Sequence, residues 1–294
     1  MSLGEGEYTY RLVSDWAKLP SRMSFEAVTG AAVDSSGAVY VSNRGKNPVL
    51  VFDGEGNFLD TWGERLFRRS HSIFTDFEDN IFCVDDESHI AMKFSPKGRL
   101  IFTLGERDYP SYTGFFGTSY AYADGKVPIR AGGPFNLPTK AVVNPEGTIF
   151  VSDGYGNSRV HKFSKDGELL LSWGEPGSGP GQMILPHGLC VAEDRVYVTD
   201  RVNSCVHVYT DEGDFIADWK DADHPNDACL GVDGNLYIGE RSRVTVRTLE
   251  GEILASIGEE GGPSAVFPHG LGLDPDGNIY VAQLGRGLIK LIRQ

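Results

Sequence analysis

Three histidines, His71, His187 and His269, stand at one position of a segment that repeats along this sequence. His187 and His269 both lie within a Pro-His-Gly tripeptide that opens an apolar run. The equivalent positions of the other repeats hold Thr29, Thr139 and Asn226. A histidine therefore occurs in every second repeat. Three neutral imidazoles that leave a fourth position open are the ligands of a catalytic zinc ion. The spacing predicts a zinc site if alternate repeats meet at a common axis.

The repeats are defined by an aromatic residue in the second of four expected strands. These residues are Tyr40, Phe82, Phe150, Tyr197, Tyr237 and Tyr280, with separations of 42, 68, 47, 40 and 43. Short apolar runs divided by turn residues indicate strands rather than helices. A unit of about 40 to 45 residues is typical of a propeller blade. We predict an all-β, six-bladed β-propeller that forms a single domain over residues 1–294.

The two ends of the chain are expected to complete one blade together. The last unit, residues 267–294, has room for only three strands, whereas Tyr10 to Trp16 predicts a fourth strand with no unit before it. The other three tryptophans, Trp62, Trp173 and Trp219, end fourth strands. The N-terminal strand should therefore join the last blade and close the ring, which removes exposed sheet edges.

Arginines follow several of the second strands, on the side where the histidines are expected. Arg44, Arg201 and Arg241 hold such positions, and Arg68, Arg69 and Arg130 lie in nearby connections. Because arginine binds carboxylates with a planar fork, a small anionic substrate is predicted. The alternative is a set of ion pairs with Asp85, Asp86 and Glu240.

The long gap between the second and third aromatics contains an insertion at about residues 107–133. It is rich in aromatic residues: Tyr109, Tyr112, Phe115, Phe116, Tyr120 and Tyr122. Long loops in compact domains are often binding loops or lids. The insertion is interpreted either as a partial lid with apolar walls or as a plain surface elaboration.

The net charge of −14 argues against binding to nucleic acid or to anionic membranes. The first residues show no secretory signal, although an altered start could hide one, so a cytoplasmic location is expected. The four cysteines, Cys83, Cys190, Cys205 and Cys229, are expected to be free thiols rather than disulfides. No partner protein is evident from the sequence.

The repeats resemble NHL-type propeller repeats, and the combination of motifs resembles peptidyl-α-hydroxyglycine α-amidating lyase. The resemblance covers nearly the whole chain. The matching stretches are residues 42–45 (SNRG), 151–159 (VSDGYGNSR), 185–189 (LPHGL), 200–201 (DR) and 267–270 (FPHG).

This resemblance implies zinc ligands at His71, His187 and His269, and a catalytic base at Tyr155. It also implies active-site arginines at Arg44 and Arg201. Arg241 and Phe267 are predicted as further substrate contacts, although Phe267 stands where the animal enzymes of that family have a methionine. The implied reaction cleaves the C–N bond of an N-acyl α-hydroxyglycine, or a related carbinolamide, to an amide and glyoxylate or another carbonyl acid. The family's structural calcium ligand is replaced by Gly270, so retention of Ca²⁺ is not favoured.

Two other classes of function stay open. A metal-dependent lactonase or esterase propeller would place Glu, Asp and Asn around the axis, where this sequence offers only Asn226. A non-catalytic NHL binding module needs no metal, and its histidines would only line the mouth of the channel.

Overall fold

The computed structural model describes residues 2–118, 125–259, 262 and 264–294. The chain divides into two compact units, Met1–Arg65 with Asn226–Gln294, and Leu66–Pro225. The single domain expected over residues 1–294 stays a prediction. Tyr120 and Tyr122 of the insertion lie outside the described residues. Across the described ranges, no helix is long and apolar enough to span a membrane.

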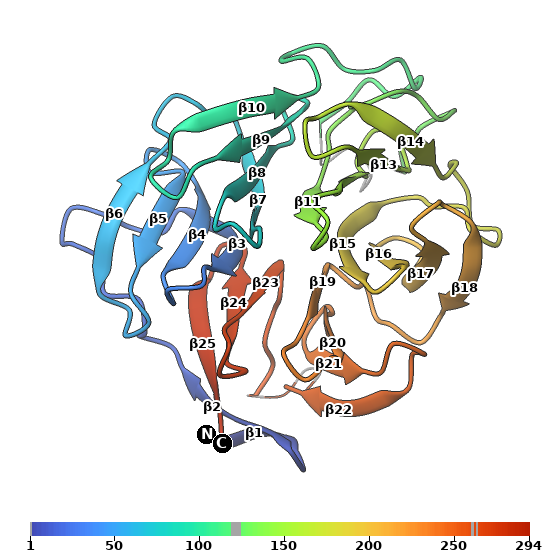
Figure 1. The fold of residues 1–294 in the computed structure, drawn as a ribbon. Coiled ribbons are helices and arrows are strands. Elements are labelled where there is room, and N and C mark those ends of the chain that lie inside the picture. The colour runs from blue at the N-terminus through green and yellow to red at the C-terminus, as the bar shows by residue number, and fades with distance from the viewer. Residues whose placement is uncertain (1, 119–124, 260–261, 263) are drawn as a thin grey trace. The chain divides into compact units, whose positions relative to one another are not determined.

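The unit Leu66–Pro225 contains three four-stranded antiparallel sheets (Figure 1). The first contains β7 Ser70–Thr75, β8 Ile81–Asp85, β9 Ile90–Phe94 and β10 Leu100–Leu104. The second contains β11 Lys140–Val143, β12 Ile149–Asp153, β13 Arg159–Phe163 and β14 Leu169–Trp173. The third contains β15 Pro186–Ala192, β16 Arg195–Asp200, β17 Cys205–Thr210 and β18 Phe215–Trp219.

The other unit also contains three sheets. One contains β3 Ala27–Val33, β4 Val39–Arg44, β5 Val49–Phe52 and β6 Phe58–Trp62. Another contains β19 Asp227–Leu230, β20 Leu236–Gly239, β21 Val244–Arg247 and β22 Ile253–Ile257. The last has the order β1-β2-β25-β24-β23, with bounds Ser2–Glu5, Tyr8–Val13, Gly287–Arg293, Ile279–Gln283 and Gly270–Leu273.

The predicted all-β, six-bladed β-propeller class is confirmed. Within the described part of the chain there are six sheets, and consecutive strands pair as antiparallel neighbours in each. The aromatic residues used to define the repeats are buried in second strands, for example Tyr197 in β16 and Phe150 in β12. Trp62, Trp173 and Trp219 end β6, β14 and β18, as predicted. Local hydrophobic alternation therefore suffices to locate every blade.

The N-terminal strand joins the last blade, as predicted, because β2 pairs with β25 through partners such as Tyr10 and Arg293. Two details differ from expectation. The strand ends at Val13, so that Trp16 lies beyond it and packs against Tyr280 with ring centroids 5.0 Å apart. In addition, β1 pairs with β2 as a fifth strand that the sequence did not reveal. The two termini lie side by side in Figure 1.

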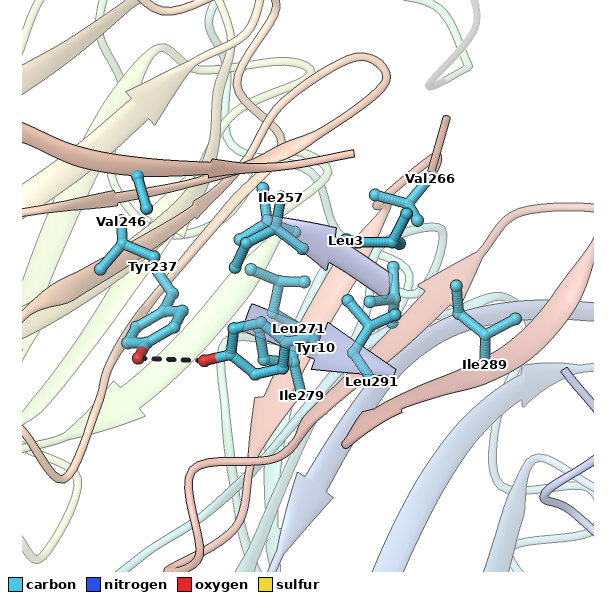
Figure 2. Packing of buried hydrophobic residues seen from close by; sticks show 13 residues of the cluster. Leu3, Tyr10, Tyr237, Val246, Ile257, Val266, Leu271, Ile279, Ile289 and Leu291 are labelled. Atoms are coloured by element: carbon cyan, nitrogen blue, oxygen red, sulfur yellow. Dashed lines mark hydrogen bonds between the residues drawn. The ribbon is translucent and has the colours of Figure 1, made fainter. Parts of the chain in front are cut away.

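The N-terminal hairpin is held by apolar burial within its own unit. Figure 2 shows Leu3 of β1 and Tyr10 of β2 among residues from the last sheet and from the β19–β22 sheet. The hydroxyl groups of Tyr10 and Tyr237 lie 3.4 Å apart. Because Leu3 and Tyr10 are almost fully buried, removing the hairpin would expose apolar surface on both sheets.

All four cysteines are free, as predicted. Cys83, Cys190 and Cys205 are buried and Cys229 is half-buried. Burial raises the pKa of the Cys83 thiol, which keeps this group neutral and unreactive.

Candidate functional site

His71 lies near the start of β7 and is 1% exposed. Its Nδ1 lies 2.7 Å from the backbone oxygen of Thr139. A carbonyl oxygen can only accept a hydrogen bond, so Nδ1 carries the proton and donates it. In the neutral ring, Nε2 is then left with its lone pair. This nitrogen lies 3.0 Å from the hydroxyl oxygen of Tyr155.

His187 approaches the same hydroxyl from the neighbouring sheet. It lies in β15, and its Nε2 is 3.2 Å from the Tyr155 oxygen. The rings of His71 and His187 have centroids 4.8 Å apart. Both histidines and Tyr155 are buried, with Tyr155 only 4% exposed. Three side chains with acid–base chemistry therefore meet at one point inside the unit Leu66–Pro225.

The hydrogen bonds at this point constrain the protons. A phenol has one proton to donate, and neutral His71 offers only an acceptor at Nε2. Tyr155 therefore donates to His71 and accepts from His187, whose Nε2 must carry a proton in this arrangement. With the His187 proton on Nδ1 instead, the Nε2 lone pairs of both histidines would be available to a cation.

Thr139 connects the two histidines. Its backbone oxygen accepts from His71, and its Oγ1 donates to the backbone oxygen of Pro186, 2.8 Å away and next to His187. The sequence places Thr139 at the same repeat position as the histidines but does not reveal this role. No sequence signal marks this role, because every residue carries a backbone carbonyl.

Two glycines permit this close packing around Tyr155. A Cβ at Gly154 would meet the Pro186 oxygen at 2.0 Å, and a Cβ at Gly156 would meet the Asn136 side-chain oxygen at 2.4 Å. Any other residue at these positions would force the neighbouring backbone away. The glycines on both sides of Tyr155 are thus explained by the lack of room for a side chain in the turn between β12 and β13.

Carboxylates at the ends of second strands hold the loops that carry the histidines. Asp200 accepts from the backbone N–H groups of Ile184 and Leu185, at 2.8 and 3.0 Å, just before His187. In the β7–β10 sheet, Asp85 accepts in the same way from the backbone just before His71. Both carboxylates are fully buried. These charge-assisted bonds fix the backbone from which each imidazole projects.

The third histidine, His269, belongs to the other compact unit, which contains residues Asn226–Gln294. It lies directly before β23 and is 7% exposed. Its Nδ1 lies 2.8 Å from the backbone oxygen of Thr29. As with His71, this bond assigns the proton to Nδ1 and leaves the lone pair on Nε2. The same backbone contact therefore fixes the tautomer of both histidines.

The predicted substrate residues are divided between the units. Arg201 is half-buried in the unit that holds Tyr155, and its backbone N–H donates to the Leu185 oxygen at 3.1 Å, so it lies beside the loop of His187 as expected. Arg44, Arg241 and Phe267 belong to the other unit, where Arg44 and Phe267 are half-buried and Arg241 is exposed. The Arg286 guanidinium lies 4.0 Å from the centre of the Phe267 ring.

Arg68 and Arg69 form ion pairs within the protein, which was the alternative to substrate binding considered from the sequence. Arg69 pairs with the buried carboxylate of Asp86, and Arg68 lies 3.0 Å from Asp108. Arg130 instead lies over the ring of Tyr112, 4.2 Å from its centre. These three side chains therefore have partners within the protein.

Part of the aromatic insertion forms a wall beside Tyr155. Phe115 is 6% exposed and packs in one cluster with Leu137, Tyr155 and Leu185. By contrast, the other described aromatics of the insertion are exposed: Tyr109, Tyr112 and Phe116. Phe115 therefore makes an apolar contact with Tyr155, while the choice between a lid and a surface elaboration stays a prediction.

His207, on β17, lies between two carboxylates. Its Nδ1 is 2.6 Å from Asp218 and its Nε2 is 3.3 Å from Asp200. Burial opposes a charge on this ring, but hydrogen bonds to Asp200 and Cys205 outweigh burial and raise the pKa of His207 to about 10. The raised pKa favours the protonated form of His207, which is paired with both carboxylates.

The stability of the fold is expected to fall as pH rises, because of His207. Its pKa is raised above the ordinary value of 6.5, so its stabilisation is complete below about pH 6.5 and is lost as pH rises toward about 10. The loss should be on the order of 5 kcal/mol. Denaturant unfolding at several pH values across this window checks the slope, which His207→Gln should flatten. An equally steep slope in this variant would contradict the assignment.

Comparison with protein families finds NHL repeats at residues 135–163 and 184–209, and a β-propeller repeat at residues 257–282. The chain is 30% identical to "NHL repeat-containing protein 3" of Homo sapiens, over 94% of this chain and 82% of that protein. It is 33% identical to "Peptidyl-alpha-hydroxyglycine alpha-amidating lyase 1" of Drosophila melanogaster, over 39% of this chain and 18% of that protein.

Among solved structures, "Streptogramin B lyase structure" resembles this chain with a TM-score of 0.67. The alignment covers 97% of this chain and 98% of that one, at 15% identity. At 15% identity, this similarity shows a shared fold and nothing about activity.

Proposed function

We propose that this chain, which belongs to the family of NHL repeat-containing protein 3, forms a propeller that acts as a metal-dependent carbon–nitrogen lyase. The substrate would be an N-acyl α-hydroxyglycine or a related carbinolamide, and the products an amide and glyoxylate or another carbonyl acid. Relatives named as amidating lyases, in fly and nematode, support the lyase class.

The observation that carries the proposal is the position of Tyr155. Its hydroxyl oxygen lies 3.0 Å from Nε2 of His71 and 3.2 Å from Nε2 of His187. A buried phenol between two imidazoles has no evident role in packing alone, because a phenylalanine would fill the same apolar cluster. A general base must be held in a fixed place, and these two contacts fix the hydroxyl that would serve as the base once it has lost its proton.

The donor set fits zinc. As a set, His71, His187 and His269 could hold a metal ion, and all three are buried. For His71 and His269, a backbone carbonyl engages Nδ1 and leaves Nε2 for a ligand bond. Histidines that bind zinc usually donate the N–H of their other ring nitrogen to a backbone oxygen or a carboxylate. Zinc, when bound, would act as a Lewis acid that makes the substrate hydroxyl easier to deprotonate.

In its deprotonated form, Tyr155 would take the proton from the hydroxyl of the carbinolamide. The electrons of that O–H bond form the new carbonyl, the C–N bond breaks, and the amide nitrogen receives the proton. One molecule thus gives an amide and a carbonyl acid without an oxidant or an added water. An ordinary tyrosine has a pKa of about 10, so a base of this kind depends on cationic neighbours at neutral pH.

The substrate carboxylate would be held by arginine. Arg201 follows β16 directly, and its backbone is bonded to the loop that leads to His187. We assign Arg44 and Arg241 the same kind of contact, and Phe267 an apolar contact with the substrate. A planar guanidinium matches both oxygens of a carboxylate, which would orient the reacting carbon toward Tyr155.

A non-catalytic binding module is the second candidate. It is favoured by the relatives aligned over most of their length, whose name, NHL repeat-containing protein 3, states no activity. The two candidates differ in their metal content and in their turnover.

Elemental analysis of purified protein without added metal tests the proposal. We expect about one zinc per chain, the content of one site with three protein ligands. Incubation with N-acyl α-hydroxyglycines should release glyoxylate. Chelation should abolish this release and added zinc should restore it. Protein that binds no zinc and releases no glyoxylate would favour the binding module.

A further inference from the structure

The turn that carries Tyr155 is supported by a segment from outside its own hairpin. Tyr155 follows β12 and precedes β13. Its backbone N–H donates to the Leu137 oxygen at 3.3 Å, and that of Gly156 donates to the Asn136 oxygen at 3.0 Å. The position of the phenol therefore depends on how firmly Asn136 and Leu137 are held.

Leu137 is held by His89, a residue of the neighbouring β7–β10 sheet. The Leu137 N–H donates to Nδ1 of His89 at 3.1 Å. Because an N–H can only donate, Nδ1 must carry a lone pair, which requires the neutral ring. Burial lowers the pKa of His89 and so favours this form. His89 has a φ of 58°, a left-handed conformation that fixes its side chain at the β8–β9 turn.

Gly156 and Asn136 are held by Thr113 of the insertion. Thr113 is fully buried, and its Oγ1 donates to the Gly156 oxygen at 2.6 Å. The same Oγ1 accepts from the Asn136 side chain at 3.0 Å. Two residues further on, Phe115 packs in the same cluster as the Tyr155 ring. The insertion thus contacts both the backbone and the side chain of this turn.

We propose that His89 and Thr113 are positioning residues, which together keep the Tyr155 hydroxyl within reach of His71 and His187. The inference rests on the proposed role of Tyr155 as the base. His89 acts through Leu137, and Thr113 acts through Gly156. The two supports come from different parts of the chain and meet at consecutive residues of one turn. A misplacement of about 1 Å at a reacting group can cost on the order of 100-fold in rate.

The His89 support is tested by His89→Gly and His89→Asn. Glycine and asparagine both tolerate the left-handed conformation of residue 89, so the two variants should not differ through backbone strain. Only asparagine offers an acceptor oxygen near the place of Nδ1. We expect His89→Gly to lower kcat about 10- to 100-fold with KM and zinc content unchanged, and His89→Asn to recover most of that loss.

The Thr113 support is tested by Thr113→Val and Thr113→Ser. Valine keeps the shape of the side chain and removes the hydroxyl, whereas serine keeps the hydroxyl. Thr113→Val should lower kcat about tenfold or more, and Thr113→Ser should stay close to the wild type. Equal effects of valine and serine would point to packing and overturn the role assigned to the hydroxyl.

Amide hydrogen exchange of residues 153–159 provides a readout independent of turnover. In the full zinc-loaded chain, His89→Gly and Thr113→Val should accelerate exchange there about tenfold, with the unfolding midpoint nearly unchanged. Unchanged exchange in both variants would overturn the inference. If the wild type releases no glyoxylate, the proposed function fails, while exchange still decides whether these residues hold the turn.

Discussion

Tyr155→Phe is expected to lower kcat by about 10²- to 10⁴-fold, the range for loss of a general base. The substitution removes only the hydroxyl, because the ring can keep its contacts with Phe115, Leu137 and Leu185. KM should change little if the carboxylate is held by arginine. Zinc content should stay the same because the proposed ligands are untouched. Steady-state kinetics and elemental analysis of the same preparation check both expectations.

A matched control for this variant is Tyr109→Phe, since Tyr109 is 67% exposed on the insertion. It should have wild-type kinetics. If Tyr155→Phe kept near-wild-type turnover, the assignment of the base would be wrong. If it instead lost its zinc, Tyr155 would be a ligand rather than the base.

His71→Gln and His187→Gln are expected to weaken zinc binding by more than about 100-fold and to abolish turnover. Removing a residue that hydrogen-bonds to a zinc ligand costs about 10- to 100-fold in zinc affinity, so loss of a ligand itself should cost more. Glutamine is close to histidine in size and keeps polar groups in the buried site, which limits the effect on folding. Zinc affinity measured by competition with a chelator, alongside kinetics, gives the result.

His224→Gln serves as the control, because the His224 side chain is 45% exposed and pairs with Asp223. It should bind zinc as the wild type does. Retention of full zinc affinity in both His71→Gln and His187→Gln would contradict the proposed metal site. Loss of zinc with unchanged turnover would contradict the metal's role in the reaction.

The blades could be predicted from the sequence because each is a local pattern. Tyr197 and Tyr237 are buried in second strands, and Trp173 and Trp219 end fourth strands, all within units of regular length. The pairing of β2 with β25 followed from counting strands, because the last unit lacked one. The extra strand β1 was missed, since Ser2–Glu5 has only Leu3 as a buried residue and so gives little pattern.

The candidate site was predictable only in its residue types. His71, His187 and His269 could be found because they occupy one position of the repeat. The roles of Thr139, Thr113 and His89 could not be found in this way. A backbone carbonyl, a buried hydroxyl and a neutral imidazole acceptor leave no periodic signal, and their partners lie in other sheets or in the insertion.

By itself, the sequence determined the all-β class, the six repeated sheets, the N-terminal completion of the last sheet and the histidines at alternate repeats. The tertiary structure decided that the Tyr155 hydroxyl lies between two imidazoles. Its partners His71 and His187 are 84 and 32 residues away along the chain. Strand patterns arise from neighbours in sequence, whereas this contact depends on how separate sheets and an irregular insertion pack against one turn.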